Sequence, residues 1–181
     1  MDMYKLKFTT LQEEMLRFLS IRSGASFTAR AIARHLRVSP TAIAKSLKRL
    51  EQEEMIKVNK DKESKRFSIQ LNKDNPLTYQ FKRADNLKLI YESGLLEYLS
   101  ETLPAATIIL FGSYSFGEDT LNSDIDLAII GAKQKEVNLD KFNRLLERNV
   151  SINFYPGLKD VNKNLKENIF NGIVLKGGIQ L

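Results

Sequence analysis

The stretch LFGSYSFGEDTLNSDIDLAII, residues 110–130, decides how this sequence is interpreted. It begins and ends in short apolar, β-branched runs of the kind found in buried strands. Between these runs stand a Gly-Ser pair and, after ten further residues, two aspartates separated by a single isoleucine. Because strand side chains alternate, we expect Asp124 and Asp126 to point to one side and Ile125 to the other.

Two carboxylates side by side repel each other, so either one is protonated or a cation lies between them. The chain has no cysteine and a single histidine, His35, so any metal site must be built from carboxylates. Mg²⁺ prefers oxygen ligands, commonly one or two carboxylates together with water and substrate phosphates. We therefore expect Asp124 and Asp126 to hold Mg²⁺ or Mn²⁺.

Gly112 and Ser113 follow the first apolar run, where the strand turns into a helix or loop. Glycine lets the backbone approach a phosphate, and backbone amides together with the serine hydroxyl can hold its oxygens. A triphosphate held there, and through metal by Asp124 and Asp126, suits nucleotidyl transfer to an acceptor hydroxyl.

The Gly-Ser pair followed by ten residues and "DID" resembles the signature of the DNA polymerase β nucleotidyltransferase superfamily, especially its minimal prokaryotic members. The similarity runs from about residue 95 to 175. It includes an expected helix near 139–148, a strand near 150–155 and the closing stretch LKENIFNGIVL. The resemblance implies transfer of NMP, most often AMP from ATP, to an acceptor hydroxyl that in some members lies on a protein.

One departure concerns the third acidic residue that family members generally place on the next strand, where it shares a metal and deprotonates the acceptor. Here that strand reads RNVSINFYP, residues 148–156, and the matching position is Ser151 or Asn153, depending on register. Neither can act as a base, although Asn153 offers one neutral oxygen to a metal. Glu147 and Asp160 are close in sequence but fall outside the expected strand.

The charge is divided unevenly along the chain. Residues 1–75 carry 16 Lys and Arg against 9 Asp and Glu, a balance of +7, whereas residues 76–181 have a balance of −1. A basic module joined to a nearly neutral one suggests that the first part meets a polyanion.

Helical periodicity predicts helices from about residues 10 and 28, and a third, TAIAKSLKRLEQEEM (41–55), opened by the N-cap Ser39 and Pro40. The side of the third helix opposite its apolar residues can touch phosphates and base edges. It consists of Thr41, Lys45, Lys48 and Gln52.

A β-hairpin is predicted next by the alternation in IKVNKDKESKRFSIQLN, residues 56–72. Its basic tip consists of Lys60, Lys62, Lys65 and Arg66. Three helices and a basic hairpin, over residues 8–72, resemble the winged helix-turn-helix of prokaryotic transcription regulators, which implies a double-stranded DNA partner. The basic side chains as an ordinary solvated face, and a winged helix that docks proteins, remain alternatives.

The predicted fold is α/β (α+β): a winged helix-turn-helix (1–75), a connecting helix (76–94) and a polymerase-β-like domain with a small mixed sheet (95–181). We expect a Mg²⁺-dependent nucleotidyltransferase coupled to DNA binding. The alternative is a DNA-binding regulator whose second domain only binds a nucleotide. No apolar run suits a membrane helix or signal peptide, so we expect a cytoplasmic protein. A homodimer is possible because winged helices often read two half-sites.

Overall fold

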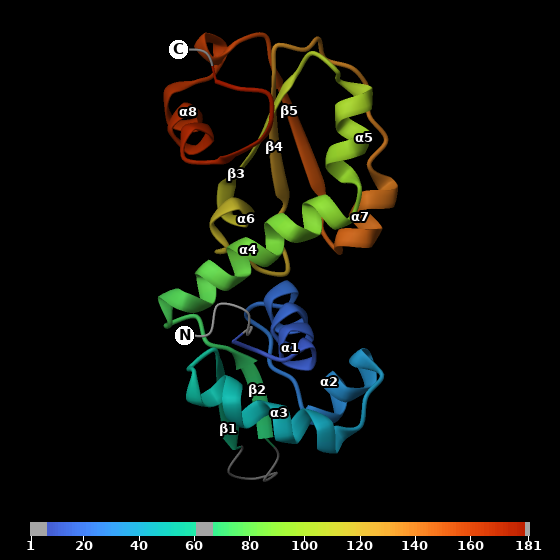
Figure 1. Ribbon diagram of the computed structural model, residues 1–181. Coiled ribbons are helices and arrows are strands. Elements are labelled where there is room, and N and C mark those ends of the chain that lie inside the picture. Colours follow the sequence, from blue (N-terminus) through green and yellow to red (C-terminus); the bar gives the residue numbers. More distant parts are fainter. Residues whose placement is uncertain (1–6, 61–66, 180–181) are drawn as a thin grey trace. The chain divides into compact units, whose positions relative to one another are not determined.

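The computed structural model describes residues 7–60 and 67–179, and the chain divides into two compact units, Met1–Tyr79 and Gln80–Leu181 (Figure 1). Helix α4 (Pro76–Glu92) begins in the first unit and continues in the second. None of the helices in the described ranges is long and apolar enough to cross a membrane.

The first unit has three helices followed by a two-stranded hairpin. Its elements are α1 (Thr10–Ile21), α2 (Ala29–Leu36), α3 (Pro40–Gln52), β1 (Ile56–Lys60) and β2 (Phe67–Leu71). Hydroxyl side chains cap all three helices: Thr9 accepts from the N–H of Gln12 in a capping box, and Thr28 and Ser39 cap α2 and α3. The predicted start of the third helix at Ser39 and Pro40 is confirmed.

The hairpin strands pair antiparallel, from Ile56 beside Leu71 to Lys60 beside Phe67. Phe27, in the connection between α1 and α2, adds a bridge to this ribbon, because Phe27 and Ile69 each donate an N–H to the other's carbonyl at 2.8 Å. This arrangement confirms the predicted winged helix. Three residues of the predicted basic tip, Lys62, Lys65 and Arg66, lie outside the described residues.

The second unit contains a four-stranded mixed sheet in the order β5-β4-β3-β6. β3 (Thr107–Phe111) pairs antiparallel with β4 (Ile125–Ile130) and β6 (Ile173–Lys176), whereas β4 and β5 (Val150–Tyr155) are parallel. The other elements are α5 (Leu95–Thr102), α6 (Gly112–Phe116), α7 (Asp140–Leu146), the 3-10 turn Leu158–Asp160 and α8 (Lys163–Phe170). The predicted small mixed sheet is confirmed.

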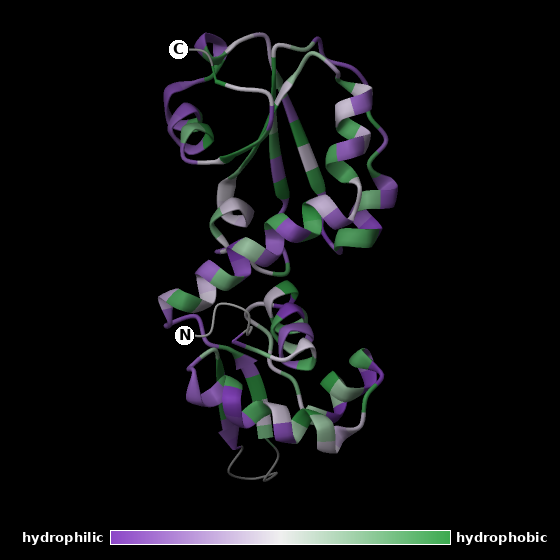
Figure 2. Cartoon of the chain, in the orientation of Figure 1, coloured by the Kyte–Doolittle hydropathy of each residue, from purple (hydrophilic) through white to green (hydrophobic). Residues whose placement is uncertain are grey.

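Hydrophobic residues cover both faces of this sheet. Leu127 and its alternate neighbours on β4 pack with α5 and α7, while Ala128 packs on the opposite face with Ile169 of α8. Hydrophobic and hydrophilic residues alternate around the helices (Figure 2). The sheet is therefore largely buried in its middle, and Asp126 and Ser151 each stand second in their strands, near one end of the sheet.

Gly94 separates α4 from α5. Its φ of +75° is a left-handed conformation that glycine adopts without steric cost, and α5 begins at the next residue. Gly94 thus ends the helical run.

Candidate active site

Asp126 and Gly112 lie close together in the candidate site. β3 and β4 pair so that Phe111 lies beside Asp126, and the chain then turns at Gly112 with φ of +73°. A Cβ at residue 112 would lie only 2.8 Å from Asp126 Oδ2. The positive φ therefore favours glycine, and a side chain at this position would require the Asp126 carboxylate to shift.

Hydrogen bonds fix the turn that follows. Ser115 Oγ donates to the carbonyl of Gly112 at 2.8 Å, and the N–H of Glu118 donates to the carbonyl of Ser113 at 2.9 Å. Asn86 Nδ2, on α4, donates to the carbonyl of Tyr114 at 2.9 Å. Short helix α6 is thus held from both sides, and Gly112 and Ser113 have a fixed backbone beside Asp126.

Asp126 is a half-buried carboxylate near the charge of Asp124. Burial, and secondly the charge of Asp124, raise the pKa of Asp126 above the ordinary value for aspartate. Asp124 immediately precedes β4 and Asp126 is its second residue. A half-buried carboxylate that resists ionisation beside another carboxylate is stabilised by a cation, and the oxygen donors suit Mg²⁺.

The parallel pairing of β4 and β5 decides which residue occupies the position of the third acid. Asp126 pairs with Ser151 and Ala128 pairs with Asn153, so both β5 residues share the face of Asp126. Ser151 is directly beside Asp126. Asn153 is two residues further along β5, about 7 Å from Ser151. Metal binding by Asn153 stays a prediction.

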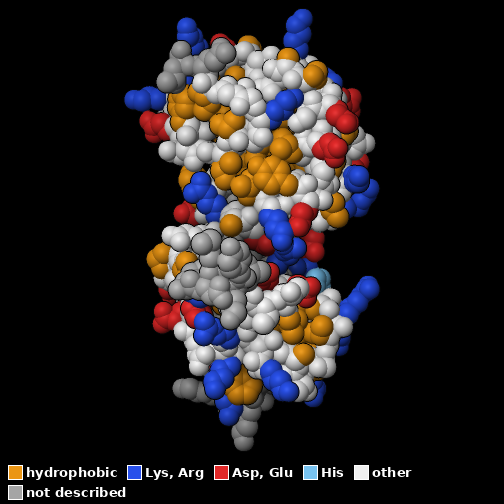
Figure 3. Space-filling view, viewed as in Figure 1, with side chains coloured by type: hydrophobic (Ala, Val, Ile, Leu, Met, Phe, Trp, Pro, Cys, Tyr) orange, Lys and Arg blue, Asp and Glu red, His pale blue; other side chains and the backbone are white. Residues whose placement is uncertain are grey.

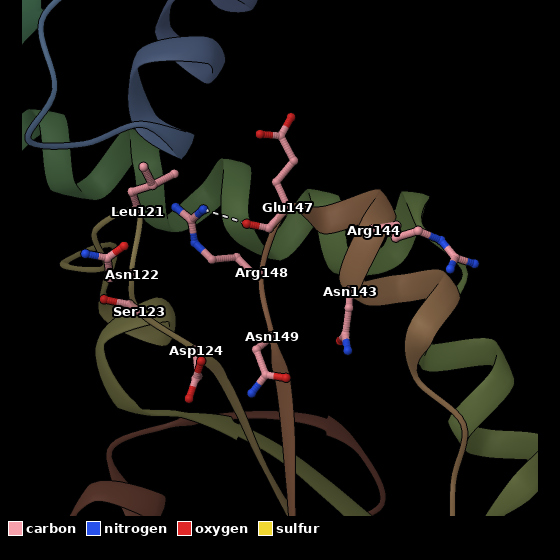
Figure 4. Close-up of a pocket in the computed structure, with 9 residues that line it drawn as sticks. All are labelled: Leu121, Asn122, Ser123, Asp124, Asn143, Arg144, Glu147, Arg148 and Asn149. Carbon is pink, nitrogen blue, oxygen red and sulfur yellow. Dashed lines mark hydrogen bonds between the residues drawn. The ribbon is translucent and has the colours of Figure 1, made fainter.

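Other acids near this strand lie elsewhere. Asp160 follows the far end of β5, whereas Asp124 lies at the end where β4 and β5 begin. Glu147 caps the end of α7, and its side chain points away from Asp124 (Figure 4). Within residues 7–60 and 67–179, no three acidic or histidine side chains gather as a metal site. Asp124 and Asp126 are therefore the carboxylates that could hold a metal here, and metal binding by them stays a prediction.

Asp119 is a buried carboxylate in the loop between the Gly-Ser turn and the two aspartates. Lys82 Nζ lies 2.9 Å from its Oδ1, and Arg148 Nη2 donates to its Oδ2 at 3.3 Å. Asn86 Nδ2 also donates to Oδ1, at 2.8 Å, and Lys82 donates to the backbone carbonyl of Asp119. The side chains of Lys82, Asp119 and Arg148 are at most 2% exposed.

This cluster positions the site-bearing loop, because its members come from three separate segments. Lys82 and Asn86 lie on α4, Asp119 on the loop, and Arg148 just before β5. The sequence did not predict it. A single aspartate among turn residues resembles an exposed loop residue, and its partners are 37 and 29 positions away.

A pocket of about 460 Å³ adjoins Asp124. Figure 4 shows Asp124 and Asn149 near the starts of β4 and β5, with Asn143 directed toward the same region from α7. Asn149 is the residue before β5, and its carbonyl accepts the N–H of Ile125 at 2.8 Å. Sequence reasoning did not identify Asn143 or Asn149, although asparagines near a strand start are a weak signal of a polar site.

The predicted DNA-contacting side of α3 is exposed. The exposed residues are Thr41, Lys45, Lys48 and Gln52 on α3, together with Lys60 at the end of β1. Basic side chains gather at the end of this unit where α3 and the hairpin lie (Figures 1 and 3). Arg30 and Arg34 on α2 are also exposed, and the sequence interpretation did not include them.

Each of the two units matches a different family of known proteins. Residues 93–177 match the polymerase beta nucleotidyltransferase family. Residues 10–67 match the MarR family. The chain thus combines a MarR-type winged helix with a polymerase-beta-type nucleotidyltransferase-like domain. No curated protein matches the chain.

Among solved structures, the chain is similar to the adhesin competence repressor AdcR from Streptococcus pyogenes at 24% identity, covering 53% of this chain and 71% of that one, with a TM-score of 0.40. A ZitR mutant from Lactococcus lactis is 25% identical, covering 56% of this chain and 74% of that one, with a TM-score of 0.41. MepR from Staphylococcus aureus, solved with DNA, is 22% identical, covering 52% of this chain and 81% of that one, with a TM-score of 0.38.

Replacing Asp119 tests the buried cluster. Asp119→Ala leaves Lys82 and Arg148 buried without this carboxylate, and we expect it to lower the free energy of unfolding by about 3 to 5 kcal/mol. Glu118→Ala, at the exposed neighbouring position, changes it by less than about 0.5 kcal/mol. Urea denaturation measures both, and equal effects of the two substitutions would contradict a positioning role for Asp119.

The raised pKa of Asp126 predicts a pH-dependent effect on stability. The folded, metal-free protein holds this proton more tightly than the unfolded chain, so its stability falls as pH rises through the folded pKa. We expect Asp126→Asn to raise the Tm at neutral pH in a chelator and to have a smaller effect at acid pH. Thermal scans across pH check this, with the exposed Asp160→Asn variant as control. A pH-independent difference would contradict it.

Proposed function

We propose that this protein binds double-stranded DNA through its winged helix and transfers NMP, most often AMP, from a Mg²⁺-bound NTP to an acceptor hydroxyl. The contact of Asp126 with Gly112 supports the second activity most strongly. It brings a carboxylate suited to metal against a backbone turn suited to phosphate. The match of residues 93–177 to the nucleotidyltransferase family supports the same proposal.

Each side chain then has a defined role. The backbone amides and hydroxyl of Gly112 and Ser113 hold the terminal phosphates, and Asp124 and Asp126 hold the metal. When bound, Mg²⁺ supplies charge neutralisation and lowers the pKa of a ligated hydroxyl. The acceptor oxygen bonds to the α-phosphorus, the bond to the β-phosphate oxygen breaks, and pyrophosphate leaves with the electron pair. The hydroxyl proton passes to solvent.

Calorimetric titration of ATP in the presence of Mg²⁺ tests nucleotide binding without knowledge of the acceptor. We expect metal-dependent binding to the wild-type protein and its loss in the Asp124→Asn, Asp126→Asn double variant, because neutral amides are poor Mg²⁺ ligands. Asp140→Asn, an exposed aspartate at the start of α7, serves as control. Equal affinity in the wild-type and the double variant would contradict the site.

A second candidate function is a DNA-binding regulator whose second domain binds a nucleotide without turnover. The pairing of Ser151 with Asp126 favours it, because a serine there cannot serve as the base that a carboxylate would provide. In this case the nucleotide acts as a signal. The predicted homodimer fits either function and stays a prediction.

Ser151→Asp distinguishes the two candidates. A carboxylate beside Asp126 supplies a base, and we expect it to raise the transfer rate by about 10² to 10⁴, measured as pyrophosphate release from ATP. Asn153→Asp serves as the comparison, since residue 153 lies two positions further along β5. Measurable release by the wild-type protein supports the enzyme, whereas release by the Ser151→Asp variant alone supports the regulator.

DNA binding by the winged helix is supported by the exposed basic side of α3 and by the MarR family match. MarR-like relatives bind DNA. Lys45→Ala with Lys48→Ala should weaken binding to duplex DNA and reduce the slope of log K against log salt by about two units, one for each phosphate contact. Lys159→Ala with Lys163→Ala removes the same charge from the second unit and serves as control. Equal effects of both pairs would contradict a specific DNA face.

A further inference from the structure

Helix α4 carries a stripe of buried side chains that begins in the first unit and continues in the second. Thr78, Lys82, Asn86 and Ile90 follow one another at intervals of four residues, and each is at most 4% exposed. Side chains four positions apart lie on the same side of a helix. Lysine and asparagine are rarely buried unless they are bonded, so this stripe holds α4 by specific polar contacts as well as by apolar packing.

The start of α4 is bonded to the end of α3 within the winged-helix unit. Asn75 Nδ2 donates to the backbone carbonyls of Glu53 and Glu54, at 3.3 and 3.1 Å, where α3 has just ended. Asn75 Oδ1 accepts the N–H of Leu77 at 3.0 Å and so caps the first turn of α4. One side chain therefore joins α4 to the helix that we propose for DNA contact.

Further along α4, Asn86 is bonded to both halves of the proposed nucleotide site. Its Nδ2 donates to the carbonyl of Tyr114, on the short helix α6 of the Gly-Ser turn, at 2.9 Å. The same nitrogen donates to Asp119 Oδ1 at 2.8 Å, on the loop that leads to Asp124. Lys82, one turn earlier on α4, is paired with Asp119 as well. A shift of α6 or of this loop therefore changes the hydrogen bonds of α4.

The interior of α4 is suited to pass a displacement along its length. From Leu77 to Glu92 it contains neither glycine nor proline, the residues that most often bend a helix. Asn75 and Asn86 are separated by about 16 Å along the axis of an α-helix. A ligand that draws in the loop at Asp124, or α6 at the Gly-Ser turn, thus acts on the end of α3 through a single stiff element.

We propose that α4 couples the two ligand sites, so that Mg²⁺-bound nucleotide in the second unit changes the affinity of the winged helix for DNA. This inference rests on the proposed nucleotide and DNA sites and adds a regulatory link between them. The two states differ in the hydrogen bonds of Asn86 and Asn75. Coupling between binding sites is reciprocal, so DNA changes the nucleotide affinity by the same factor. The link operates whether or not the nucleotide is turned over.

The test measures one coupling factor by two routes, with the full chain. Fluorescence anisotropy gives the Kd of a labelled mixed-sequence DNA duplex with and without saturating Mg²⁺ and α,β-methylene-ATP, an analogue that cannot be transferred. Calorimetry gives the Kd of the same analogue, in Mg²⁺, with and without saturating duplex. We expect both Kd values to change by the same factor, of about fivefold or more.

Asn75→Asp separates coupling from binding. The substituted carboxylate keeps the oxygen that accepts from Leu77 and loses the amide that donates to the end of α3. We expect the coupling factor to fall below about twofold, while each ligand alone binds as it does to the wild-type protein. Asn162→Asp is the matched control, because Asn162 caps α8 through the N–H of Leu165, and it should leave the factor unchanged.

A pair of glycines tests the stiffness of α4 itself. Gln80→Gly with Ala84→Gly replaces two exposed residues between the two contact points and should also lower the factor, because glycine loosens a helix interior. Lys88→Gly with Tyr91→Gly places a second pair at exposed positions beyond Asn86. This control pair should keep the wild-type factor.

Three results would overturn the inference. A wild-type factor of one, with both ligands bound, would reject coupling and leave the proposed function intact. An unchanged factor in Asn75→Asp and in the Gln80→Gly, Ala84→Gly variant would reject α4 as the link. Failure of either ligand to bind alone would reject its proposed site, and the coupling with it.

Discussion

Gly112 turns the backbone, with φ of +73°, against the carboxylate of Asp126, and this contact favours glycine because a Cβ there would lie 2.8 Å from Asp126 Oδ2. The contact joins two features that the chain builds separately, a backbone turn after β3 and a carboxylate near the start of β4. Antiparallel pairing of Phe111 with Asp126 brings them together. Burial and the charge of Asp124 then raise the pKa of Asp126 above the ordinary value for aspartate. The contact that shapes the Gly112 turn thus also places the carboxylate that we propose as a metal ligand.

The buried Asp119 cluster keeps this arrangement in place. A carboxylate paired with two cations in the protein interior contributes little net stability compared with apolar residues, because desolvation offsets the attraction. Its hydrogen bonds are nevertheless directional, and Lys82, Asn86 and Arg148 hold the loop from α4 and from the start of β5. Since α4 begins in the winged-helix unit, the helix that anchors the loop carrying Asp119 is covalently continuous with the basic module.

Local signals in the sequence predicted most of the fold. The capping pair Ser39 and Pro40, the alternation in the hairpin and the apolar runs around the Gly-Ser and Asp-Ile-Asp motifs each specify their own element. The sequence did not determine the register of β5, which distinguishes Ser151 from Asn153 as the partner of Asp126. It also gave no sign of Asp119, whose partners are distant in sequence. Such features depend on tertiary pairing, and no local periodicity encodes them.

The most direct test of a metal-nucleotide site is a crystal grown with Mn²⁺ and α,β-methylene-ATP, measured for anomalous scattering at the manganese edge. We expect a strong anomalous peak between the carboxylates of Asp124 and Asp126, with the triphosphate on the Gly112 and Ser113 amides. A triphosphate bound elsewhere, or manganese absent from both carboxylates while the nucleotide is present, would contradict it.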